Sequence, residues 1–183
     1  MAYKIVFFDM DGTLYQTEND IIQESSLQAI QALKEQGYIV CAATGRPLNQ
    51  MNLILERVQF DYMVMINGGY VLDQRLLFEN PLDRQTTQDI VDWCEQQENG
   101  LMFHFGDTSY IYDKFYPFYY FCRDHHVLNY LFYDEQRSYH KRHNAYNAVL
   151  MTKDQRSLKA SVTAQRFDRG CTGSFLFRCI QCK

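Results

Sequence analysis

The chain has 183 residues, of which 46% are hydrophobic and 22% charged, and its formal net charge is -4. This composition is that of an ordinary folded protein, and it argues against a disordered chain and against a polybasic binder of nucleic acid. No run approaches the roughly 20 apolar residues of a membrane span, and the first residues lack the features of a signal peptide. We therefore expect a cytoplasmic, globular protein that binds neither nucleic acid nor membranes.

The cysteines do not indicate a disulfide framework. Cys41, Cys94 and Cys122 fall within apolar periodic segments, where a thiol packs as a small hydrophobe. Cys179 and Cys182 form a CxxC pair, but structural zinc needs four ligands. We favour free thiols over a zinc site.

Short apolar runs alternate with helical periodicity in the first part of the chain. Strands are expected at residues 4–8, 38–43 and 62–66, and the first should be buried on both faces. Residues 25–36 have helical spacing, and Pro47 suits the first turn of a second helix that carries residues 48, 51, 55 and 58 inward. This order of elements predicts an α/β fold with a parallel sheet.

The pattern changes after Gly68. A hairpin is expected at residues 70–72 and 76–78, helices at 83–98 and 115–127, and strands at 101–105, 110–112 and 145–151. Antiparallel strands mixed with helices predict an α+β insertion on the parallel core.

Polar residues follow each of the three predicted parallel strands. They are Asp9, Thr44 and Asn67. In parallel sheets, ligands bind beyond the carboxyl ends of the strands, so these three side chains are expected to face one site.

The sequence Asp9-Met10-Asp11-Gly12 places two carboxylates directly after the first strand. One carboxylate could attack phosphorus while the other handles the proton, and Gly12 would let backbone N–H groups approach a phosphate. Mg²⁺ would be needed to offset the repulsion between these anions and an anionic substrate. The alternative is an Asp-rich turn that only ends a strand, and Thr44 could likewise be only a helix N-cap.

Four segments, FFDMDGTL, AIQALKEQGYIVCAATGRP, MINGGYVLD and FENPLD, resemble the Cof-type branch of the haloacid dehalogenase superfamily. The resemblance implies a Mg²⁺-dependent phosphatase, a phosphoric monoester hydrolase acting on sugar phosphates or similar small metabolites. It also implies a Rossmann-like core with an α/β cap inserted after the third strand. Accordingly we expect a core at residues 1–81, a cap at 82–166 and a tail at 167–183.

The resemblance also assigns roles to residues. Asp9 would be the nucleophile and a metal ligand, and Asp11 the general acid/base and a metal ligand through its backbone carbonyl. Thr44 would bind phosphate. The remaining positions that match the phosphate site and the cap hinge are Gly12, Gly45, Arg46, Asn67 and Gly68.

The family's lysine motif and its later GDxxND-like metal motif are not found, so the core is expected to be incomplete, the chain truncated and Mg²⁺ binding weakened. Residues 174–180 could add a strand to the edge of residues 4–8, and the exposed core surface could support a homo-oligomer. A catalytically inactive remnant or binding protein of the same fold is the alternative function, and a phosphomutase is a third.

Two further runs of the sequence can each be interpreted in two ways. The aromatic run at residues 115–121 could wall a substrate pocket, but we favour packing against the cap sheet. The basic run at 137–143 is expected to be a solvated loop.

Overall fold

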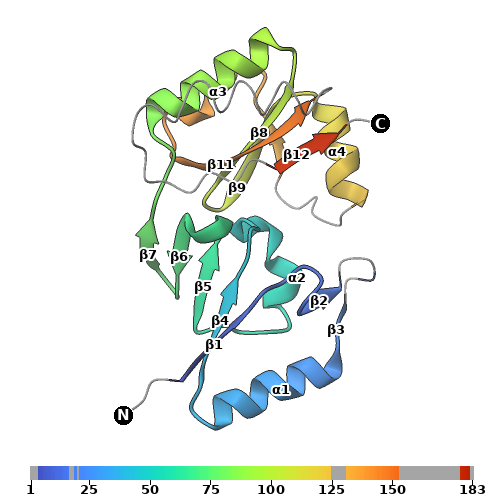
Figure 1. The fold of residues 1–183 in the computed structure, drawn as a ribbon, viewed down its shortest axis with the longest axis vertical. Coiled ribbons are helices and arrows are strands. Elements are labelled where there is room, and N and C mark those ends of the chain that lie inside the picture. The colour runs from blue at the N-terminus through green and yellow to red at the C-terminus, as the bar shows by residue number, and fades with distance from the viewer. Residues whose placement is uncertain (1–3, 17–18, 20, 125–130, 153–177, 182–183) are drawn as a thin grey trace. The chain divides into compact units, whose positions relative to one another are not determined.

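The computed structural model describes residues 4–16, 19, 21–124, 131–152 and 178–181 (Figure 1). The chain divides into two compact units, one made of Met1–Asn80 and Cys122–Tyr130 and the other of Pro81–Phe121 and Leu131–Lys183. Within the described residues, no helix is long and apolar enough to span a bilayer.

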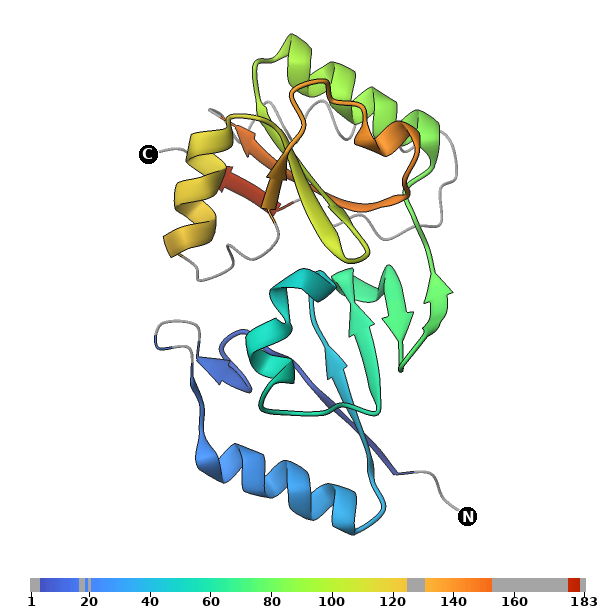
Figure 2. The same ribbon diagram turned by 180° about the vertical axis from the view of Figure 1, so that it is seen from behind.

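The first unit is built on a mixed five-stranded sheet in the order β1-β4-β5-β6-β7. Its elements are β1 (Ile5–Phe8), β2 (Tyr15–Gln16), β3 (Ile21–Ile22), α1 (Glu24–Glu35), β4 (Ile39–Ala43), the 3-10 turn η1 (Leu48–Gln50), α2 (Asn52–Leu55), β5 (Tyr62–Met65), the 3-10 turn η2 (Ile66–Gly68), β6 (Tyr70–Leu72) and β7 (Leu76–Glu79). Strands β1, β4 and β5 are parallel, and β6 and β7 continue the sheet as an antiparallel hairpin. The predicted parallel core and hairpin are therefore confirmed, and both can be followed from behind in Figure 2.

Strand β1 differs from the expectation that it is buried on both faces. Ile5 and Phe7 are 48% and 58% exposed. The physical reason is its position, because β1 lies at the end of the sheet and pairs only with β4 among the described strands. Self-association through this apolar stripe stays a prediction.

The expected helix after Pro47 is not continuous. It is divided at Met51 into η1 and the four-residue α2. The carbonyl of Gln50 accepts a hydrogen bond from Arg46 Nη1 at 2.9 Å, and the N–H of Ile54 instead donates to Met51. A side chain thus takes the acceptor that a continuous helix would use. Met51 and Val58 are nevertheless buried, as the pattern predicted.

The second unit contains a five-stranded sheet in the order β10-β9-β8-β11-β12. Its elements are α3 (Arg84–Gln96), β8 (Gly100–Phe105), β9 (Thr108–Asp113), α4 (Phe115–Asp124, in this unit as far as Phe121), β10 (Leu131–Tyr133), the 3-10 turn η3 (Tyr139–Lys141), β11 (Ala145–Thr152) and β12 (Arg178–Gln181). The central strands β9, β8 and β11 are antiparallel, which agrees with the predicted α+β insertion.

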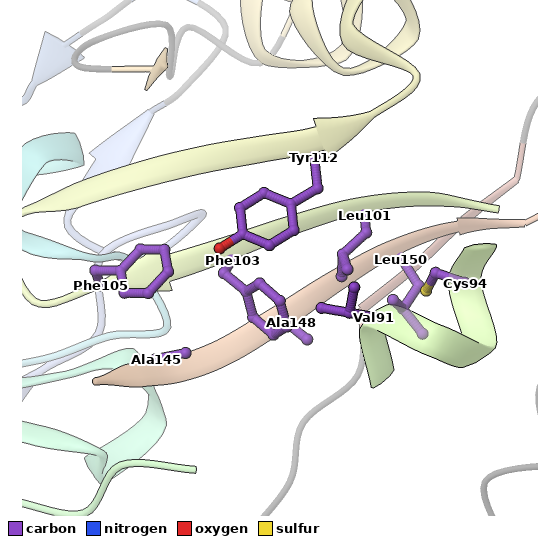
Figure 3. Packing of buried hydrophobic residues seen from close by; sticks show 9 residues of the cluster. All are labelled: Val91, Cys94, Leu101, Phe103, Phe105, Tyr112, Ala145, Ala148 and Leu150. Atoms are coloured by element: carbon purple, nitrogen blue, oxygen red, sulfur yellow. The ribbon is translucent and has the colours of Figure 1, made fainter. Parts of the chain in front are cut away.

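Alternation along β8 divides the core of this unit between the two faces of the sheet. Phe103 and other residues on one face pack with Val91 and Cys94 of α3, as Figure 3 shows. On the other face Met102 packs with Phe118 of α4. Each fully buried side chain of this size contributes about 1.5–3 kcal/mol.

The aromatic run on α4 is only partly used in this core. Phe118 is fully buried and Phe115 and Phe121 pack against the same cluster, whereas Tyr116 and Tyr120 are 69% and 49% exposed. The expectation of packing therefore holds for one face of the helix.

The C-terminal strand pairs elsewhere than expected. Within residues 174–180, the described part begins at β12, which pairs in parallel with β11 and places Arg178 opposite Val149. The edge of β11 that is not bonded to β8 supplies the partner, so the proposed addition to β1 is wrong for these residues. Cys41, Cys94 and Cys122 are free and buried, as predicted.

The basic run at 137–143 is not wholly solvated, because it contains a buried histidine. His140 Nε2 lies 3.0 Å from Gln88 Oε1, and its Nδ1 lies 3.0 Å from the hydroxyl of Tyr112. The amide oxygen of Gln88 can only accept, so Nε2 carries the proton and, in the neutral ring, Nδ1 accepts from Tyr112. Burial, and next the charge of Lys141, lower the pKa of His140, while Asp134 and Asp92 act in the opposite sense.

We expect the protein to lose stability through His140 as the pH falls. The folded pKa is below the unfolded value of about 6.5, so the unfolded chain takes up the proton first. The contribution of His140 is therefore complete above about pH 6.5 and is lost as the pH falls towards the folded pKa. Urea denaturation of the wild type and of His140→Gln across this interval measures the effect.

His143→Gln is the matched control, because His143 lies in the same run but is exposed. It should keep the pH dependence of the wild type, whereas His140→Gln should show a smaller one. An equal dependence in His140→Gln and the wild type would contradict the assignment.

Candidate active site

The turn after β1 holds Asp9 at the end of the strand. The N–H of Leu14 donates to the carbonyl of Asp9 at 3.2 Å, and the N–H of Tyr15 donates to that of Met10 at 2.9 Å. Gly12, with φ of 75°, supplies the left-handed conformation of the reversal. Met10 and Leu14 are buried, whereas the Asp9 side chain is exposed. The backbone of Asp9 is thus fixed and its carboxylate faces outward.

Thr13 orients the Asp9 carboxylate. Its hydroxyl donates to Asp9 Oδ2 at 3.1 Å. A hydrogen bond to one carboxylate oxygen restricts rotation of the group and leaves the second oxygen for other partners.

Thr44 follows β4 and is tied to the end of β5. Its N–H donates to the carbonyl of Val64 at 2.9 Å, and its carbonyl accepts from the N–H of Asn67 at 3.1 Å. The hydroxyl, in a residue only 6% exposed, accepts from the N–H of Arg46 at 3.1 Å. The alternative role of Thr44 as a helix N-cap is not seen, because Pro47 is the N-cap of η1 and makes no side-chain bond there.

The segment after β5 has an unusual backbone. Ile66, Asn67 and Gly68 have φ values of 50°, 55° and 90°. Positive φ is strained for a β-branched residue such as Ile66, and such strain gathers at functional sites. The segment is held by the hydrogen bond from the N–H of Ile66 to the carbonyl of Arg46 at 3.2 Å and by burial of Ile66.

Gly45 permits the close approach of this segment. A Cβ at position 45 would lie 3.0 Å from Asn67 Oδ1 and 3.3 Å from Asn67 Nδ2. These distances are shorter than ordinary van der Waals contact, so a larger residue would displace the Asn67 side chain.

A pocket of about 330 Å³ lies where the three parallel strands end. Its lining residues are Asp9, Ala43, Thr44, Gly45, Val64, Asn67 and Gly68. The structure thus brings together five of the residues selected from the sequence. Asp11, Gly12 and Arg46 do not belong to this lining.

Asp11 and Arg46 instead form an ion pair. Nη2 of Arg46 lies 2.6 Å from Asp11 Oδ1, and Nε lies 3.1 Å from Oδ2. The Arg46 side chain is 6% exposed and the Asp11 side chain 52%. A buried guanidinium requires such partners, because an unpaired buried charge is costly. Tyr15 and Gln50 also contact Arg46, and sequence reasoning missed both since neither belongs to a local motif.

The oxygen donors near the pocket match the chemistry of Mg²⁺ only in part. Asp9 offers a carboxylate of the kind that magnesium prefers, and magnesium often takes its remaining ligands from water and a substrate phosphate. Among the described residues, no group of three or more His, Cys, Asp or Glu could hold a metal ion. The donor set fits a magnesium ion that binds together with a phosphorylated ligand.

Three comparisons relate the chain to known proteins. A family profile described as haloacid dehalogenase-like hydrolase matches residues 6–175. YkrA of Bacillus subtilis, named as a candidate phosphatase, is 28% identical over 109 residues, which are 59% of this chain and 42% of YkrA. YitU of the same organism, named 5-amino-6-(5-phospho-D-ribitylamino)uracil phosphatase, is 34% identical over 68 residues, covering 37% of this chain and 25% of YitU.

Solved structures share the fold. A hypothetical protein from Geobacillus kaustophilus superposes with a TM-score of 0.76 at 24% identity, covering 88% of this chain and 62% of that protein. A sugar phosphatase of haloacid dehalogenase subclass IIB gives a TM-score of 0.66 at 22% identity, covering 77% and 56%. The chain therefore spans less than two thirds of the length of these relatives.

Substitution of Gly68 by alanine is expected to destabilise the protein by about 1–2 kcal/mol, the usual cost of a left-handed conformation for a residue with a Cβ. Gly69 supplies the matched control, because its φ of -73° is open to alanine. Urea denaturation of Gly68→Ala and Gly69→Ala gives the two costs. Equal costs would show that the backbone of Gly68 is not strained by a side chain.

Proposed function

Because the chain belongs to the haloacid dehalogenase-like hydrolases, we propose that it is a Mg²⁺-dependent phosphatase that works through an aspartyl-phosphate on Asp9. Its substrates would be small phosphorylated metabolites of the cytoplasm. The reaction would be hydrolysis of a phosphoric monoester.

One observation carries this proposal. The carboxylate of Asp9 shares a pocket with Thr44 and Asn67, each from the end of a different parallel strand. A phosphoryl group in that pocket could receive hydrogen bonds from side-chain and backbone donors on two strand ends while it faces the carboxylate on the third. A nucleophile opposite converging donors is the arrangement that phosphoryl transfer requires.

The proposed reaction has two steps. An oxygen of Asp9 attacks phosphorus, the P–O bond to the substrate alcohol breaks, and Asp11 gives a proton to the departing oxygen. Water then attacks phosphorus, the bond to Asp9 breaks, and Asp11 takes the proton of the water. Splitting the reaction in this way replaces one difficult displacement by two easier ones.

Magnesium, when bound, would offset the negative charge that gathers between Asp9 and the phosphoryl oxygens. Asp9 would hold it through a carboxylate oxygen and Asp11 through its backbone carbonyl. The hydroxyl of Thr13, which donates to Asp9 Oδ2, keeps the Asp9 carboxylate from rotating freely. The other ligands would be water and the substrate phosphate.

The names of the relatives support a choice of test substrates. YitU is named for a phosphorylated ribitylamino compound, and one structural relative is described as a sugar phosphatase. Both descriptions point to phosphate on a polyhydroxylated carbon chain. We therefore propose sugar and sugar-alcohol phosphates as the first compounds to be screened.

Asp9→Asn is expected to abolish phosphate release, because the amide oxygen is a poor nucleophile and cannot carry the intermediate. Asp11→Asn should lower kcat by about 10²-fold or more, the usual range for acid/base catalysis. Release of p-nitrophenol from p-nitrophenyl phosphate in the presence of Mg²⁺ measures both.

Glu56→Gln is the control, since Glu56 is an exposed carboxylate in the same unit and away from the pocket lining. It should keep wild-type activity. Full activity in purified Asp9→Asn protein would refute the nucleophile assignment, and an inactive wild type would favour a binding protein of the same fold.

Removal of divalent cations with EDTA should eliminate the activity, and Mg²⁺ should restore it. Ca²⁺ should not, because it is larger and accepts looser oxygen geometry. The dependence of the rate on Mg²⁺ should change with substrate concentration, since the substrate phosphate would supply a ligand. Unchanged turnover in EDTA would rule out the metal requirement.

A further inference from the structure

The side chain of Arg46 is fixed from three directions. Its Nε and Nη2 bind the two oxygens of Asp11, and its Nη1 donates to the carbonyl of Gln50. The ring of Tyr15 lies against the guanidinium, with its centroid 4.9 Å from Cζ, a contact of the cation–π type. A planar guanidinium held at its edge and on its face has one orientation.

Tyr15 is itself rigid. It is 2% exposed, and its backbone bonds to both sides of the turn that carries Asp11. Its N–H donates to Met10, and its carbonyl accepts from the N–H of Gly12 at 3.1 Å. The Tyr15 ring and the Asp11 carboxylate therefore belong to one turn. Arg46, which follows β4 and is 35 residues from Asp11 in the sequence, contacts both.

Arg46 does not line the pocket that contains Asp9, Thr44 and Asn67. Its charge acts on Asp11 rather than directly on a ligand in that pocket. A guanidinium that binds both oxygens of a carboxylate fixes the plane of that carboxylate as well as its position.

We infer that Arg46, supported by Tyr15, is a positioning residue that orients the Asp11 carboxylate as the base for hydrolysis of the aspartyl-phosphate. The inference rests on the proposed function. In that step the water oxygen bonds to phosphorus, the P–O bond to Asp9 breaks with its electron pair returning to Asp9, and the water proton goes to Asp11. The bidentate contact sets the plane of the carboxylate, which the point charge of a lysine cannot do.

The test separates the two half-reactions with p-nitrophenyl phosphate in stopped flow. Its leaving group departs without help from an acid, so formation of the intermediate should not need an oriented Asp11. Arg46→Lys should therefore lower kcat by about 10–100-fold, the scale of a misplaced catalytic group, and leave kcat/KM within about threefold. A burst of about one p-nitrophenol per enzyme should precede the slow phase, because the intermediate accumulates.

Tyr15→Leu, which removes the ring, should change kcat in the same direction but less, and Tyr15→Phe should restore it. Arg75→Lys in the exposed hairpin is the control and should behave as the wild type.

In an Asp11→Asn background, Arg46→Lys should have little further effect, since the effects of residues that act through one another are not additive. Circular dichroism checks that each variant is folded.

Equal decreases of kcat and kcat/KM without a burst in folded Arg46→Lys and Tyr15→Leu would overturn the positioning role while leaving the phosphatase proposal intact. An additive effect in the Asp11→Asn background would overturn it as well. If the wild type releases no p-nitrophenol, the proposed function fails and this inference fails with it.

Discussion

The left-handed backbone of Ile66, Asn67 and Gly68 is the constraint on which the candidate site depends. A single residue in such a conformation costs about 1–3 kcal/mol unless the surroundings impose it. Here two backbone hydrogen bonds join the segment to the residues after β4. The same bonds place the Asn67 side chain over Gly45, so the conformation of one loop determines the wall of the pocket and the path of the neighbouring loop.

Much of the site followed from the sequence because parallel strands end at one edge of a sheet. Asp9, Thr44 and Asn67 each stand directly after an apolar run, and strand pairing alone brings them together. The glycines at 45 and 68 were also identified, and the structure gives each a separate reason: close approach of Asn67 at the first and a positive φ at the second. These features depend on local sequence and on topology, both of which a sequence pattern contains.

The rest depended on contacts between side chains distant in sequence. In the sequence, Tyr15 fits the pattern of one more apolar residue after the turn. Its ring meets Arg46 only in the folded chain. The break after η1 also depends on a side-chain contact. The hydrophobic spacing fits a continuous helix, but the guanidinium of Arg46, outside that helix, donates a hydrogen bond to the Gln50 carbonyl. In the second unit, His140 lies in a run of charged residues, and its burial comes from Gln88 and Tyr112 on other elements.

The division of the segment after Pro47 also has an electrostatic consequence. A long helix starting there would add the aligned peptide dipoles of several turns and present a positive end near the loop that carries Thr44. With η1 of three residues and α2 of four, separated at Met51, few dipoles are aligned and the field at the N-terminus is small. The N–H and hydroxyl groups at this edge of the sheet then act on an anion one by one and at short range, beside any bound magnesium ion, and such groups discriminate by shape and distance more sharply than a diffuse field would.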